Sequence, residues 1–231
     1  MSAAFPAISY TEATRLMLSA VRERLSEPPP LPHSVKKLRC PVGFLFLRGD
    51  REGAGSQLAR EMIASFGYLG TDSGRDFDFI LPGWEYSRAM RFHVRSFLAF
   101  RSRIESLSQW RYSGETELLL CNFDYDVAAD RGQFTFDEVM VLPVEQMIRE
   151  GRVPHLDHFF HQLIQFARSA NRNSSNSVVW QISDRFGIHR GGKLLWDFLA
   201  NNFIVKTVTG IFTGLRPFAV CDLRIPNDRS A

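Results

Sequence analysis

The chain has 231 residues, of which 45% are hydrophobic and 23% charged, and its 28 basic and 25 acidic residues leave a formal net charge of +3. This composition excludes a disordered chain, a collagen-like repeat and a coiled coil, and the charge is too small to require a polyanionic partner. The 20 phenylalanines require either a sizeable core or a protected interface.

The sequence predicts a reducing, cytoplasmic setting with no membrane insertion. Cys40, Cys121 and Cys221 lie far apart, which fits neither a disulfide framework nor a cysteine-based zinc site. The N-terminus lacks the charged-then-apolar order of a signal peptide. No uninterrupted apolar run approaches the ~20 residues that span a bilayer.

An amphipathic helix is predicted over 11–26, because apolar residues recur at helical spacing and Thr11 can cap its first turn. The proline-rich segment 28–32 then ends it. We interpret this segment as a stiff linker, and an SH3-type ligand is the alternative. Residues 1–38 are therefore expected to precede a core domain over 39–169.

Within that core domain, continuous apolar runs predict buried strands over 42–47, 77–81 and 117–123. Helical periodicity predicts helices over 56–66, 85–108, 137–150 and 155–169. Strands that alternate with helices predict an α/β fold, with a parallel or mixed sheet flanked by helices.

A small C-terminal α+β segment is expected over 170–231, after a polar, serine-rich stretch. Its predicted parts are a helix over 193–201 and a β-hairpin formed by 203–208 and 217–223, packed on the core. A winged helix-turn-helix is the alternative interpretation, with basic side chains placed at the phosphates of a nucleic acid.

A glycine-rich turn follows the first predicted strand. Glycines there let backbone N–H groups approach a phosphate, and the following helix N-terminus adds partial positive charge. The motif is incomplete, because Leu58 stands where GxGxxG has its third glycine, and an ordinary strand-to-helix turn is the alternative. The candidate phosphate-binding residues of this turn are Arg48, Gly53, Gly55 and Ser56.

Carboxylates close two of the predicted strands: Asp50 follows the first, and Asp124 and Asp126 share one face of the third. If these strands are parallel neighbours, the three side chains converge at the carboxyl edge of the sheet. They would then be catalytic, with Asp124 and Asp126 holding Mg²⁺ or Mn²⁺. Caps and turns are the alternative. Asp76 and Asp78, which enter the second strand, are expected to be solvated or capping.

Two further groups could bind ligands. Arg88, Arg91 and Arg95 lie on one face of the predicted helix 85–108 and are candidates for an anionic ligand, with simple solvation as the alternative. The segment 155–161 carries three histidines and an aspartate, which fit either a metal site or a solvated helix face.

Together these features predict a small α/β domain that binds a nucleotide or another phosphorylated ligand at the carboxyl edge of its sheet. A metal-assisted hydrolase or transferase is the corresponding enzyme class. The alternative is a noncatalytic subunit that binds a protein or nucleic acid partner, or a second copy of itself, through a phenylalanine-rich surface.

Overall fold

A computed structural model of the chain describes residues 4–7, 9–26, 36–47, 61, 77–85, 91–151, 153, 156–169, 178–179, 181–182 and 222–225. Its elements are β1 (Ala4–Ala7), α1 (Tyr10–Ser26), β2 (Lys37–Phe46), β3 (Asp78–Pro82), β4 (Trp84–Glu85), β5 (Arg91–Phe92), α3 (Val94–Leu107), β6 (Glu117–Asp126), β7 (Arg131–Leu142), α4 (Val144–Arg149) and α5 (Leu156–Ser169).

The main sheet has five strands in the order β1-β3-β2-β6-β7, and β4 pairs with β5 in a separate two-stranded sheet. Strands β1, β3 and β2 are parallel, whereas β6 and β7 are each antiparallel to their neighbours. Of the two sheet types expected, parallel or mixed, the structure has the mixed one. The three parallel strands end together at Ala7, Pro82 and Phe46, and we call this end of the sheet the carboxyl edge.

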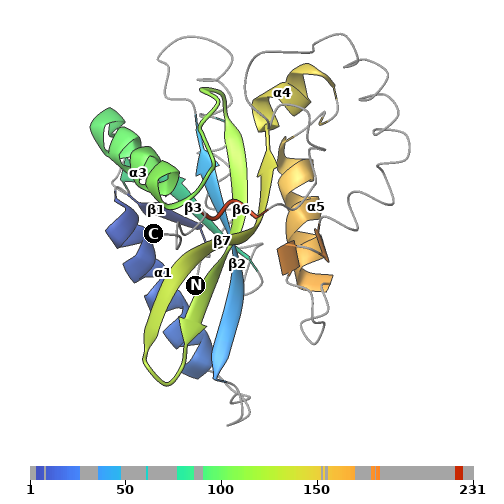
Figure 1. Cartoon of the computed structure of the whole chain (residues 1–231). Helices are drawn as coiled ribbons and strands as arrows, with labels where there is room; N and C mark the ends of the chain where they lie inside the picture. The colour runs from blue at the N-terminus through green and yellow to red at the C-terminus, as the bar shows by residue number, and fades with distance from the viewer. Residues whose placement is uncertain are drawn as a thin grey trace.

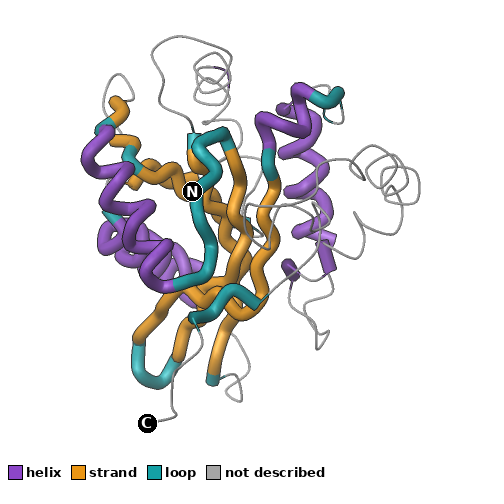
Figure 2. Tube along the Cα trace, turned by 45° about the horizontal axis from the view of Figure 1, so that its top comes forward, coloured by secondary structure: helices purple, strands orange, loops and turns teal. Residues whose placement is uncertain are grey.

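Helices cover both faces of the main sheet: α1 and α3 pack on one face, and α4 and α5 on the other (Figure 1). In Figure 2 the strands, drawn in orange, lie between the purple helices of the two layers. Alternating residues of β6 supply both faces, because successive side chains of a strand point in opposite directions. Leu118 and Leu120 join the α5 side, whereas Leu119 and Cys121 join the α1 side.

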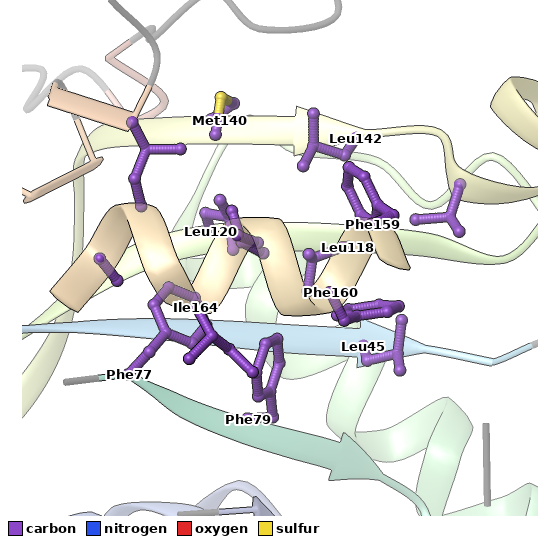
Figure 3. Packing of buried hydrophobic residues seen from close by; sticks show 14 of the residues in the cluster. Leu45, Phe77, Phe79, Leu118, Leu120, Met140, Leu142, Phe159, Phe160 and Ile164 are labelled. Atoms are coloured by element: carbon purple, nitrogen blue, oxygen red, sulfur yellow. The ribbon is translucent and has the colours of Figure 1, made fainter. Parts of the chain in front are cut away.

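On the α5 side, the apolar stripe of α5 lies across four strands (Figure 3). The rings of Phe160 and Phe79 meet edge to face, with their centroids 5.4 Å apart. Phe159 and Ile164 lie on the same stripe and are buried. Because a stripe at helical spacing covers a flat apolar surface, this part of the core forms as the sequence predicts.

Aromatic rings fill the opposite side. Phe44 of β2 lies 5.6 Å from Phe100 of α3 and 4.8 Å from Phe134 of β7, in both cases edge to face. This is the arrangement that aromatic quadrupoles favour. Of the two explanations offered for the phenylalanine content, a sizeable core accounts for the rings that the structure places here.

Two predicted helices are wrong in part. Residues 137–142, expected to begin a helix, belong to β7, and Pro143 separates that strand from the short helix α4. The helix expected over 85–108 begins only at Val94, because 91–92 form β5 and pair with β4. Phe97, Phe100 and Ile104 of this helix are buried, whereas Val94 is exposed.

The chain termini contribute to the same sheet and core. The sequence pattern did not reveal β1, which pairs with β3. Leu223 is buried, and its N–H donates to the carbonyl of Phe136 at 2.8 Å. The predicted C-terminal helix, the hairpin apart from its last two residues, 222 and 223, and the winged-helix alternative lie outside the described residues. None of the described helices is long and apolar enough to cross a membrane.

Candidate functional site

Gly83 anchors the start of α3 at the carboxyl edge. Its N–H donates to the carbonyl of Ala7 at 2.9 Å, and its own carbonyl accepts from the N–H of His93 at 2.8 Å. Gly83 has a φ of +77°, and a Cβ here would lie 2.6 Å from the Cβ of Phe97. Only glycine combines this conformation with so close an approach. The first turn of α3 therefore lies beside the ends of β1 and β3.

The first turn of α3 has no acidic residue of its own to pair with its backbone N–H groups. His93 is the N-cap residue, its side chain makes no capping hydrogen bond, and the turn contains no acidic residue. Unpaired N–H groups at a helix start carry partial positive charge. Arg95 lies in the same turn, and Arg91 lies two residues before the cap. Both side chains are exposed, and within the described part of the chain neither has an ion-pair partner.

A histidine–glutamate pair lies beside these arginines. His93 Nε2 is 2.8 Å from Glu85 Oε2, and the two side chains are 41% and 40% exposed, so solvent and ligands can reach them. The pairing of β4 with β5 sets Glu85 opposite Arg91 and Trp84 opposite Phe92. The Trp84 and Phe92 rings pack 5.1 Å apart, which fixes the short hairpin.

The structure thus brings two of the predicted ligand-binding residues, Arg91 and Arg95, to the carboxyl edge. They lie there on β5 and α3, not on one helix face as expected. The remaining candidates lie outside the described residues: Arg48, Asp50, Gly53, Gly55, Ser56 and Arg88. All but Arg88 belong to the segment that follows β2 in the sequence, and β2 ends at this edge.

Asp124 and Asp126 lie at the opposite end of the sheet. Their predicted place at the carboxyl edge required the first and third predicted strands, now β2 and β6, to be parallel, and this premise is wrong. The antiparallel register sets Phe46 opposite Glu117 at the carboxyl edge and Lys37 opposite Asp126 at the other end. At about 3.4 Å per residue, the length of β6 places Asp126 roughly 30 Å from Glu117.

Asp124 belongs to an ion-pair cluster around Arg39. The guanidinium contacts Asp124 at 2.8 and 3.0 Å, Asp137 at 3.0 Å and Glu138 at 3.1 Å. These bonds raise the pKa of Arg39, chiefly through the hydrogen bond to Asp124. The amide of the fully buried Asn122 also donates to Glu138, at 3.2 Å. The cluster links β2, β6 and β7 through their side chains.

Asp126 caps the β6–β7 turn, because its Oδ1 accepts the N–H groups of Ala128 and Ala129 at 3.0 Å each. Such local bonds are a common use of aspartate in turns. Among the described residues no group of three or more histidine, cysteine or acidic side chains is arranged to hold a metal ion. In this part of the chain, the contacts of Asp126 correspond to the alternative interpretation, turn capping, whereas the ion pair of Asp124 with Arg39 was not expected.

Two buried carboxylates were not recognised from the sequence. Asp78, expected to be solvated or capping, is fully buried and lies 2.5 Å from Arg24 Nη2 of α1. Burial raises the pKa of Asp78, and Arg24 opposes this rise. Glu117 is 3% exposed and accepts the N–H of Ser113 at 3.1 Å. Burial raises the pKa of Glu117 to about 8, and the nearby Glu115 and Glu105 add to the rise.

The histidine-rich segment 155–161 is described only in part: it enters α5, and the side chain of His161 is half-buried there. The side chains of His155, Asp157 and His158 lie outside the described residues.

Comparisons of the chain with protein-family models, curated proteins and solved structures find no match.

Proposed function

We propose that the carboxyl edge binds the phosphate group of a nucleotide or of another phosphorylated small molecule. The observation that supports the proposal is the first turn of α3, held beside the ends of β1 and β3 by Gly83. The turn contains no acidic residue that could pair with its N–H groups. Arg95 within the turn and Arg91 just before it are both exposed. A helix N-terminus with arginines nearby is a common phosphate-binding arrangement.

The order of the strands also favours this edge. In sheets with parallel strands, ligands bind outside the carboxyl ends, where the chain leaves the sheet for its crossover connections. The segment after β2, with the candidates Arg48, Gly53, Gly55 and Ser56, is one such connection, since β2 and β3 are parallel. Asp124 and Asp126 lie at the other end of β6, so the proposal gives them no part in the site.

Within the part of the chain that the structure describes, the alternative of an interaction subunit has less support. The exposed large hydrophobic side chains among the described residues are Val94, Leu98, Val127 and Ile225. Only Val94 and Leu98 lie on the same element, one turn apart on α3. Two neighbouring side chains are far less than the surface a stable protein partner covers.

Replacing both arginines, in Arg91→Gln/Arg95→Gln, is expected to weaken phosphate binding on the order of 100-fold. Each charge-assisted hydrogen bond contributes about 1.5–3 kcal/mol, and the glutamines remove both charges. The measurement is isothermal calorimetry with inorganic phosphate, AMP, ADP and ATP on the wild type, followed by the variant with whichever of them binds most tightly.

The matched control is Arg131→Gln, which removes an exposed arginine at the far end of the sheet, opposite Asp126. It is expected to bind the same ligand as the wild type does. The proposal would be contradicted if none of the four compounds bound to the wild type. It would equally be contradicted if the double variant and the control bound alike.

A further inference from the structure

We infer that the segment 222–225 is a strap that closes the open edge of β7, and that its release lets β7 pair with the β7 of a second copy of the chain. β7 is the last strand of the main sheet, and the strap reaches it from the far end of the sequence. The inference is independent of the function proposed above. It is carried by the hydrogen bonds and the burial of Leu223.

Leu223 binds the strap on both of its sides. Its N–H donates to the carbonyl of Phe136 in β7 at 2.8 Å, and its own carbonyl accepts the N–H of Gln109 at 2.6 Å. The side chain of Gln109 also donates, through Nε2, to the carbonyl of Arg224 at 2.6 Å. An isolated antiparallel bridge joins Arg224 to Ser108. The strap therefore lies between β7 and the residues that follow α3, in the manner of a short additional strand.

The side chain of Leu223 fixes the strap to the core. It is 2% exposed and belongs to the same apolar cluster as Phe136 and Trp110. Its two neighbours, Asp222 and Arg224, are exposed and pair with each other. A single buried leucine between two exposed charged residues is thus the anchor of the strap.

The edge of β7 is open between the strap and the β6–β7 turn. The carbonyl of Phe136 faces away from β6, since it bonds to Leu223, and the strand is regular from Phe134 to Phe136, whose side chains join the same cluster. Backbone groups of an antiparallel strand alternate in direction, so those of Gly132 and Phe134 face the same open side. Within the described part of the chain, neither residue has a hydrogen-bond partner on that side.

An open row of N–H and C=O groups is a template for pairing with another strand. At the opposite edge of the described sheet, β1 has only four residues, and one of them, Pro6, has no N–H to offer. β7 has twelve residues and no proline, so it needs another protection, which the strap supplies at Phe136. The partner that fits the released edge is an identical strand, because two copies of β7 related by a two-fold axis present the same row of groups to each other.

Leu223→Pro tests the strap in the full chain, because proline removes the N–H that bonds to Phe136. Gel filtration with light scattering, at protein concentrations on the order of 10 to 200 μM, is expected to show an average mass that rises to about twice that of the wild type. Leu223→Asp, which releases the strap because it would bury a charge, should behave in the same way. Arg224→Gln is the matched control: it removes the exposed ion pair but no backbone bond of the strap, and its mass should equal that of the wild type.

Hydrogen exchange identifies the surface that associates. In Leu223→Pro, the amides of Gly132 and Phe134 are expected to exchange more slowly as the mass rises. Adding Gln133→Lys, which puts a charge on the exposed side chain between them, should restore the wild-type mass, because lysine at an edge opposes strand pairing.

Three results would overturn the inference. The first is an unchanged mass in both Leu223 variants while circular dichroism shows that they are folded. The second is an association that leaves the amides of Gly132 and Phe134 unprotected or that persists with Gln133→Lys. The third needs no variant: in the wild type the amide of Leu223 should exchange slowly, and exchange as fast as in an exposed loop would show that the strap is not closed.

Discussion

Replacing Arg24 by methionine should lower the free energy of unfolding by about 3–5 kcal/mol at neutral pH, because it leaves the buried charge of Asp78 without its partner. Asp78 is fully buried, and one of its carboxylate oxygens, Oδ2, already lacks a hydrogen-bond partner in the described part of the chain. Among the described residues its one ion pair is the contact with Arg24, which also ties α1 to the start of β3. Urea unfolding followed by circular dichroism measures the loss.

The loss should depend on pH in a definite direction. Burial raises the pKa of Asp78 and Arg24 lowers it, so without Arg24 that pKa rises further. When the pKa of a carboxyl is higher in the folded state than in the unfolded chain, the folded state binds the proton more tightly. The free energy of unfolding therefore falls as the pH rises. The deficit of Arg24→Met is therefore expected to be small in acid and to grow toward neutral pH.

Two further variants test this explanation. Arg22→Met removes an arginine of the same helix whose partner, Asp130, is exposed, and it should cost far less. Arg24→Met/Asp78→Asn removes the buried charge together with its partner and should recover most of the loss. An Arg24→Met loss no larger than that of Arg22→Met would show that the buried pair does not stabilise the fold.

Replacing Glu117 by glutamine is expected to stabilise the protein above about pH 6. Burial raises the pKa of Glu117 from 4.5 to about 8. Between these values the folded protein holds a proton that the unfolded chain has released, so the free energy of unfolding falls as the pH rises through this window. At about 1.4 kcal/mol per pH unit, the largest contribution is on the order of 4–5 kcal/mol.

Glutamine does not ionise, so it removes this dependence on pH. Its amide oxygen can still accept the N–H of Ser113. Unfolding measured from about pH 4 to pH 8 should therefore show a gain for Glu117→Gln that grows with pH and vanishes in acid. Glu23→Gln, at an exposed glutamate of α1 that is not among the groups acting on Glu117, is the control and should leave the wild-type slope. Parallel pH curves for wild type and Glu117→Gln would contradict the burial of an uncharged Glu117.

The sequence pattern located strands β2, β3 and β6 and the helix α5, because each has a long apolar run or stripe. It failed at β7, where the pairing with β6 shifts register between Leu120 and Asn122. The extra residues of β7 at this shift include Asp137 and Glu138, which interrupt the alternation expected of a strand. Both side chains contact Arg39 of β2, and the local sequence pattern does not show a tertiary contact of this kind.

The candidate site was predictable only in part. Arg91 and Arg95 were found from their residue type, but the sequence pattern did not show that Arg91 lies on β5, paired with β4, and Arg95 on α3. The direction of β6 relative to β2 could not be read from either strand, since an apolar run looks the same in both directions. Because β6 runs antiparallel to β2, Asp124 and Asp126 lie at the end of the sheet opposite the carboxyl edge.

The most direct test of the anion site is a crystal structure of the chain soaked in tungstate, a heavy tetrahedral dianion whose anomalous signal marks its position. We expect the strongest peak beside the first turn of α3, within hydrogen-bonding distance of the Arg91 and Arg95 side chains. A strongest peak elsewhere, for example beside Arg39 at the other end of the sheet, or no peak at the start of α3, would contradict a phosphate site at the carboxyl edge.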